Sequence, residues 1–401
     1  ALTFSNLTYP RMKKTLLLLL TLWTIDASAQ DSLKADIDPT LTFGAYADGY
    51  YSWYSNGDDV AQQQHDCIGA YHNNFGLNIA QVTGAYTSDR VRGVATFHFG
   101  DIPAITWANN YRFIQEANAG VRLAERLWLD VGFFKTHVGT ESFLPKDNLM
   151  SIISLGTFYG PFYQSGARLS YDTKNDWHFE AHAINGYNLH IDNNEFKTFG
   201  LLVSKKWSDK VYTSYSGMAG QENVGLLDDG YLVYQNVYTN LTFKKVDVQL
   251  GVDIAFANEW KRNLDWLPEP LVAGLATVKY HVNNEFAIGL RGEIFSDEQS
   301  INSRRINPVV ATDGSSRAAL TSRANGGMTI YGGTISLEYK PSEKGFFRIE
   351  SRMLYDPNSP LANYPEGFSS REAGVNPMLT GRTQVMATVG VYFDKTFNFA
   401  R

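Results

Sequence analysis

The sequence predicts an all-β protein, a transmembrane antiparallel up-and-down β-barrel of about sixteen strands. Apolar and polar residues alternate with period two from residue 41 to residue 399, and turn-forming clusters separate the alternating segments. The segments are about 10 to 14 residues long, roughly twice the average strand of a globular protein. An aromatic content of 14% together with 34 glycines favours strands and tight turns over helices.

The clearest alternation lies in residues 246–256. Val248, Leu250 and Val252 share one face of that segment, and Gln249 and Asp253 share the other. Alternation alone does not distinguish a barrel from a secreted β-sandwich or solenoid. Full charges in the middle of a polar face suit a water-filled lumen, and this favours the barrel.

Sixteen segments fit a strand, and fourteen or eighteen strands also fit because the segments near residues 197 and 209 are weak. An even number places both termini on the periplasmic side of the membrane. The expected starts lie near residues 41, 73, 90, 113, 127, 162, 176, 197, 209, 229, 246, 270, 284, 329, 344 and 383. Short connections, as at 174–175, 244–245, 283–284 and 341–343, alternate with long ones at 56–71, 141–163, 297–328 and 356–379.

Aromatic residues gather near the expected strand ends. Outer-membrane barrels carry such aromatic girdles at the two membrane interfaces. The sequence therefore predicts girdle positions for residues 50–54, Phe158-Tyr159 with Phe162-Tyr163, and Trp260 with Trp266.

The first residues predict export. Met12-Lys13-Lys14 forms a positive n-region, residues 15–25 form an apolar h-region, and Ala27-Ser28-Ala29 precedes a mature start near Gln30. We therefore expect an upstream extension and signal peptide over 1–29, a short periplasmic segment over 30–40, and one barrel over 41–401. No later stretch approaches 18 uninterrupted apolar residues, so we expect no transmembrane helix. This predicts export through the Sec pathway to the outer membrane of a Gram-negative cell.

The charged side chains of the polar face are the candidate functional residues. An arginine that faces lipid near the bilayer midplane costs roughly 2–4 kcal/mol, so these groups must face inward. The predicted pore-lining residues are Arg291, Glu293, Arg348, Glu350, Arg352, Arg168, Arg92 and Asp253. The same charges would also fit if they merely paired across neighbouring strands and filled the interior, but a barrel of this size is normally too wide for that. We therefore expect passive diffusion of small hydrophilic solutes through a charged lumen.

The sequence offers no strong catalytic motif, and we expect no enzyme, no cofactor and no metal site. His178 and His182 flank Glu180 on one strand face, but side chains four positions apart on a strand are about 13 Å apart. A barrel-borne hydrolase is an alternative that would need a serine, a histidine and an orienting Asn or Asp on adjacent outward strand positions. His98 has serines near it in the sequence, but nothing in the sequence places them together. A net charge of −6 gives no basic footprint for nucleic acid. The single cysteine, Cys67, has no partner for an intramolecular disulfide.

Five stretches in this order along the chain resemble the OmpL-like, type-2 family of outer-membrane β-barrel porins. They are residues 131–141, 160–171, 183–187, 291–297 and 347–352. The resemblance implies a porin-like barrel, with Glu141–Tyr163 as the constriction loop, and no enzyme. The partners expected are outer-membrane lipids, small hydrophilic solutes, the barrel-insertion machinery and further copies of the chain. A structural or partner-docking barrel plugged by its own loops is the alternative. The chain departs from the common pattern of a terminal aromatic residue, because Ala400-Arg401 follow Phe399.

Overall fold

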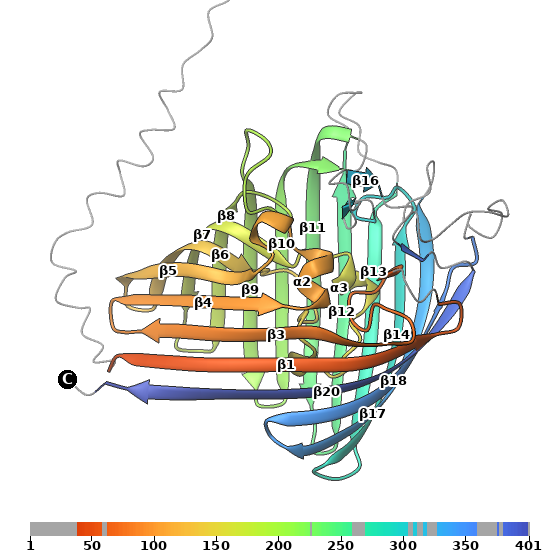
Figure 1. Ribbon diagram of the computed structural model, residues 1–401. Coiled ribbons are helices and arrows are strands. Elements are labelled where there is room, and N and C mark those ends of the chain that lie inside the picture. Colours follow the sequence, from red (N-terminus) through yellow and green to blue (C-terminus); the bar gives the residue numbers. More distant parts are fainter. Residues whose placement is uncertain are drawn as a thin grey trace, which may run out of the picture.

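The computed structural model describes residues 38–57, 62–224, 227–258, 269–303, 308–310, 316–318, 327–358, 375–376 and 380–399. The expected export signal, Trp260, Trp266 and Ala400-Arg401 lie outside these residues. Within them, sixteen strands form one closed antiparallel barrel (Figure 1). No helix among the described residues is long and apolar enough to cross a membrane.

Each barrel strand starts within two residues of its expected position. The strands are β1 Thr40–Tyr54, β3 Asn74–Thr87, β4 Val91–Phe99, β5 Ile114–Ala124, β6 Leu127–Lys135, β7 Tyr163–Asp172, β8 Trp177–Ile184, β9 Thr198–Ser208, β10 Val211–Val224, β11 Leu227–Thr242, β12 Val246–Ala257, β13 Leu271–His281, β14 Phe286–Asp297, β17 Met328–Ser342, β18 Gly345–Tyr355 and β20 Gly381–Asn398. Consecutive barrel strands pair with one another, so the up-and-down topology is confirmed.

The barrel closes between its first and last strands. β1 pairs with β20 from Thr40↔Asn398 to Tyr54↔Gln384, and the two strands lie side by side in Figure 1. The connections at the end where β1 begins and β20 ends are all short, and the long connections lie at the opposite end, where β10 and β11 also meet. The short connections are the turns that antiparallel neighbours need, and the long ones are free to fold elsewhere.

Large apolar residues line the outer face of the barrel, and many inward-facing residues are charged or polar, the reverse of a soluble protein. On β14, Leu290 and Ile294 are exposed, whereas Arg291 and Glu293 between them are buried. A hydrocarbon surrounding makes this the favourable arrangement, because an outward arginine would be stranded in lipid.

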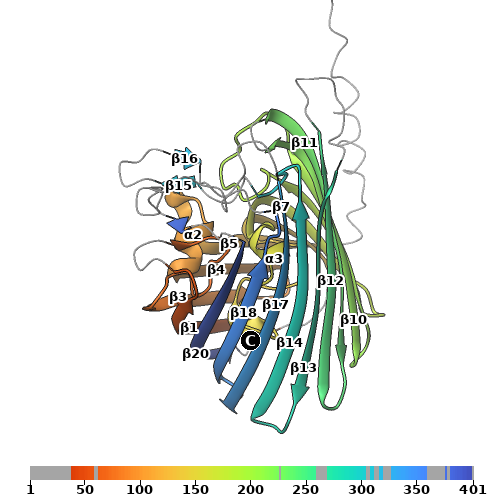
Figure 2. The same cartoon turned by 90° about the vertical axis from the view of Figure 1, so that its right-hand side faces the viewer.

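Small elements lie in the connections between the barrel strands. They are α2 Asp101–Thr106, η3 Asn109–Tyr111, η4 Pro145–Asp147, α3 Leu155–Phe158, the parallel pair β2 Gln62–Gln63 with β19 Val375–Asn376, and the pair β15 Pro308–Val310 with β16 Ser316–Ala318. Figures 1 and 2 show α3 within the outline of the barrel wall. The Ser154 hydroxyl accepts a hydrogen bond from the Thr157 amide and caps the start of α3.

The apolar core of the protein lies in the lumen. It is built around the connection between β6 and β7, residues 136–162, which we call the lumen loop. Phe158, Tyr159, Phe162 and Tyr163 are each at most 1% exposed and belong to this core. The prediction that they form a membrane girdle is therefore wrong: these aromatic residues hold the loop inside the barrel. In the segment 50–54, Trp53 is exposed as a girdle residue would be, whereas Tyr50 and Tyr54 are buried on the inner face, so the girdle prediction is wrong for these two.

Candidate functional site

The lumen loop is held to the barrel wall mainly through its backbone. The Glu350 carboxylate accepts hydrogen bonds from the Ser151 amide at 2.9 and 3.1 Å and from the Ile152 amide at 2.7 Å. Arg348, two residues earlier on β18, donates to the carbonyl oxygens of Pro145 at 2.9 Å and Asn148 at 3.1 Å. Hydrogen bonds to charged groups contribute about 1.5–3 kcal/mol each, so this wall fixes the loop firmly.

The neighbouring strands repeat this arrangement. Glu293 on β14 accepts from the Leu155 amide at 2.6 Å, and Arg291 donates to the Ile152 carbonyl at 2.7 Å. Lys279 on β13 donates to the Leu149 carbonyl at 3.2 Å. Acidic wall residues thus accept hydrogen bonds from the loop amides, and basic wall residues donate hydrogen bonds to the loop carbonyls.

A chain of buried ion pairs joins two loops through the wall. Its successive nitrogen–oxygen distances are 3.0, 3.7, 3.0, 3.0 and 2.6 Å, and its members are Glu141, Arg291, Glu293, Arg352, Asp66 and Arg382. A hydrogen bond of 2.5 Å between His65 Nδ1 and the Tyr159 hydroxyl makes a second link between the same loops. Removing one member would leave an uncompensated buried charge, which is strongly destabilising.

All eight residues predicted to line the pore lie on the inner face of the barrel. Six of them are buried: Arg291, Glu293, Arg348, Glu350, Arg352 and Asp253. The first five contact the lumen loop or the Asp66 connection, as described above. Arg92 and Arg168 lie on the other wall and share Asp130, with side chains 27% and 21% exposed. The structure therefore brings seven of them into two groups and leaves Asp253 apart from both, and their role in lining a conducting path stays a prediction.

Sequence reasoning missed several partners of these residues. Arg382, Lys279 and Glu338 are inward-facing and in phase with the alternation of their strands, so the same periodicity could have identified them. Asp66 and Glu141 belong to connections that have no periodicity, and no sequence signal marks them.

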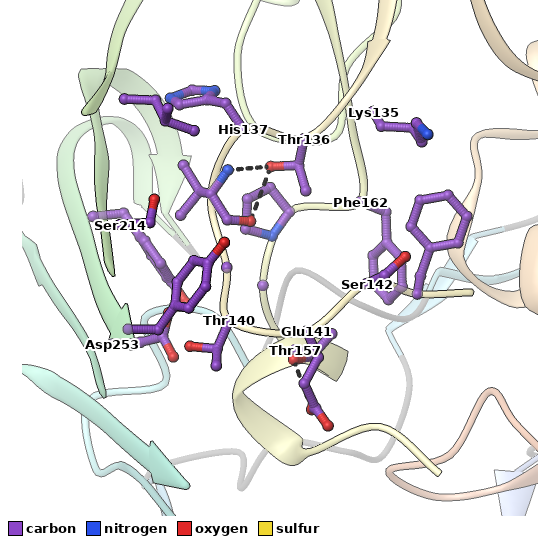
Figure 3. A pocket seen from close by; sticks show the side chains of 18 of the residues that line it. Lys135, Thr136, His137, Thr140, Glu141, Ser142, Thr157, Phe162, Ser214 and Asp253 are labelled. Carbon is purple, nitrogen blue, oxygen red and sulfur yellow. Dashed lines mark hydrogen bonds between the residues drawn. The ribbon is translucent and has the colours of Figure 1, made fainter. Parts of the chain in front are cut away.

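A cavity of about 370 Å³ remains between the lumen loop and the wall formed by β5 to β12. Figure 3 shows Asp253 and Lys135 on opposite sides of it, with Thr140, Glu141 and Thr157 of the loop between them. A second cavity, of about 320 Å³, lies at the end of the barrel that carries the short turns and is lined by Lys146, Asp247, His281 and Glu338 among others. Open polar space therefore exists on both sides of the loop.

The histidines of this region form a polar cluster. Nε2 of His178 and Nε2 of His182 lie 3.2 and 3.0 Å from the Glu180 carboxylate, and the His182 ring stacks on His137 at 4.0 Å between centroids. Burial, with a further contribution from His182, lowers the pKa of His137 to about 4. Among the described residues, no group of three or more histidine, cysteine, aspartate or glutamate residues has the arrangement of a metal site.

His98, the histidine considered above for a hydrolase, has other surroundings. His98 accepts a hydrogen bond from Gln115 at 3.2 Å and packs against the Trp107 ring at 4.6 Å. Cys67 is buried, and burial raises the pKa of its thiol, so it is not a reactive thiolate at neutral pH.

Comparison with solved structures identifies similar barrels. The chain resembles OmpT of Vibrio cholerae with a TM-score of 0.53 at 13% identity, over 89% of this chain and 98% of that one. It resembles the anion-selective porin from Comamonas acidovorans with a TM-score of 0.57 at 9% identity, over 89% and 100% of the two chains. The outer-membrane channel DcaP of Acinetobacter baumannii gives 0.53 at 9% identity, over 89% and 98%. At these identities the likeness shows the fold.

No curated protein sequence matches this chain significantly. The family model described as "Putative beta-barrel porin-2, OmpL-like" matches residues 40–393, which include every strand of the barrel except the last residues of β20. The sequence resemblance is thereby confirmed, and the barrel is one of the outer membrane. The chain belongs to the OmpL-like family of type-2 β-barrel porins.

Proposed function

We propose that the protein is a porin through which small hydrophilic solutes diffuse passively. The observation that carries this proposal is the polar cavity of about 370 Å³ beside the lumen loop. Its wall residues include the charged groups Lys135, Arg168 and Glu180 and the hydroxyl groups of Thr136 and Ser214, which can replace the hydration of a polar solute. The wall contacts of Glu350 and Glu293 hold the loop toward β18 and β14, so that the loop forms one side of this cavity and β5 to β12 form the other.

The proposal assigns different tasks to the two groups of charges. The residues around Arg348 and Glu350 position the loop, and the residues around Arg168 and Arg92 face the solute. This division explains why arginines that share the inner face differ so much in exposure. It also predicts a narrow pore, because the loop fills much of the cross-section with buried aromatic side chains.

We further propose that residues 12–29 direct Sec export, that the insertion machinery of the outer membrane assembles the barrel, and that the chain forms homo-oligomers. The export signal has the charge and apolar pattern that the Sec pathway recognises. Phe393 and Phe397 in β20 offer aromatic residues for recognition despite the two residues that follow Phe399.

Liposome swelling tests the proposal with uncharged sugars of increasing size. Vesicles that contain folded protein should swell in a monosaccharide and hardly at all in a larger oligosaccharide. Ser214 lines the cavity, whereas Thr213 beside it points away on the alternating strand β10. Ser214→Trp should slow swelling and Thr213→Trp should leave it unchanged. Vesicles with correctly folded protein that do not swell in any sugar would indicate the loop-plugged barrel instead.

A further inference from the structure

The charged residues that line the cavity beside the lumen loop are Glu116, Lys135, Glu141, Arg168, Glu180 and Asp253. All but one have an ionic partner. Arg168 lies 3.2 Å from Asp130 and 3.5 Å from Glu180, and Lys135 lies 3.9 Å from Glu116. Glu141 is paired with Arg291 at 3.0 Å. Asp253 is the exception among these six.

Asp253 is buried, at 5% exposure, and has only neutral partners. Its Oδ1 accepts hydrogen bonds from the Asn236 side-chain amide at 2.8 Å and from the Tyr234 hydroxyl at 3.1 Å. In the part of the chain that the structure describes, no lysine, arginine or histidine nitrogen lies within 4.0 Å of the carboxylate, and Oδ2 makes no hydrogen bond. Burying a carboxylate without a counter-charge is costly unless a cation reaches it.

Gly156, in the first turn of α3, leaves that second oxygen accessible. A Cβ at this position would lie 3.1 Å from Asp253 Oδ2 and 3.1 Å from the Ala273 Cβ. Gly156 and Asp253 both line the cavity, so the missing side chain leaves a gap through which the cavity reaches the oxygen. Figure 3 places Asp253 beside Thr140, whose hydroxyl is a further oxygen at the same edge.

We propose that Asp253 Oδ2 binds the cationic group of a solute in the cavity, an ammonium ion or the ammonium group of a larger molecule. The site combines one carboxylate charge with hydroxyl oxygens, which suits a monovalent hydrogen-bond donor. Asp253 thereby gives the passage a preference for cations. The binding claim stands apart from conduction, whereas the preference for cations rests on the proposed pore.

Binding is measured with isotopically labelled methylammonium and the folded protein in detergent, by the NMR line broadening of the ligand. Asp247 provides a matched control, because it lies on the same strand and inner face but is paired with His281 at 2.7 Å. The native protein and Asp247→Asn should bind alike, and Asp253→Asn should bind at least about fivefold more weakly. Gly156→Ala keeps the charge but covers Oδ2, so it should also weaken binding. Equal binding by Asp253→Asn, or no binding by the native protein, as a protonated Asp253 would give, overturns the proposal.

The preference is measured as the reversal potential across a bilayer under a gradient of KCl. Asp253→Asn should lower the potassium-to-chloride permeability ratio by at least about twofold, and Asp247→Asn should change it less. Equal changes of the permeability ratio in the two variants would mean that Asp253 acts only as one of several wall charges. This result would contradict the specific site. A silent bilayer would overturn the pore and leave the methylammonium result standing.

Discussion

Replacing Glu350 by glutamine should release the lumen loop from its wall. The carboxylate accepts the amides of Ser151 and Ile152, and a glutamine would keep one acceptor oxygen while turning an NH2 group toward the second amide. One charge-assisted hydrogen bond is lost and one buried donor is left unpaired, at a cost of about 3 kcal/mol. This corresponds to a factor on the order of 100 in the equilibrium between bound and released loop.

The assay is thiol labelling of Ser151→Cys, with and without the change at Glu350. Ser151 is fully buried, so labelling requires local opening of the loop, and its rate should rise on the order of 100-fold in Glu350→Gln. The native Cys67 is buried and contributes little background. Ser336→Ala is the matched control, because Ser336 pairs with Glu350 across β17 and β18 and, among the described residues, has no hydrogen bond to the loop backbone. Equal labelling rates in Glu350→Gln and the control would refute the anchoring account.

Three further predictions concern pH, backbone geometry and the lipid face. The lowered pKa of His137, about 4, means that the folded protein favours the neutral ring. The contribution of the neutral His137 ring to the free energy of unfolding is present above pH 6.5 and declines by about 3 kcal/mol as the pH falls to 4. Urea unfolding at the two pH values should show this decline, and His137→Asn should reduce it. Gly166 has a φ of 158° and a Cβ there would lie 2.1 Å from the Ala183 carbonyl oxygen, so Gly166→Ala should abolish the heat-modifiable folded band on a detergent gel. Leu250 faces lipid, so Leu250→Arg should destabilise the folded barrel by roughly 2–4 kcal/mol in equilibrium unfolding from vesicles. An unchanged unfolding midpoint would contradict the assignment of this face to the lipid.

The strands were predictable because lipid and lumen impose one rule on every residue of the wall. Even the weak segments near 197 and 209 are strands, β9 and β10, which begin at Thr198 and Val211. Such a strand can be predicted without knowing its partner, because the alternation of its own side chains shows which ones face lipid and which face the lumen.

The filling of the lumen was not predictable in the same way. Glu350 and Ser151 are 199 positions apart in the sequence, and no pattern in either segment predicts their hydrogen bond. The sequence predicts a girdle position for Phe158 and Tyr159 because membrane girdles and buried plugs are both rich in aromatic side chains. Apolar residues in the middle of a long outer connection are better read as a sign that the connection folds inward.

The central claim is that a water-filled passage runs beside an anchored lumen loop, and single-channel recording tests it most directly. Purified, heat-modifiable protein added to a planar lipid bilayer in KCl should insert with discrete conductance steps of uniform size. Steps small for a sixteen-stranded barrel would reflect the space that the loop occupies. Folded protein that inserts without any step, while vesicle flotation shows it in the membrane, would contradict the account.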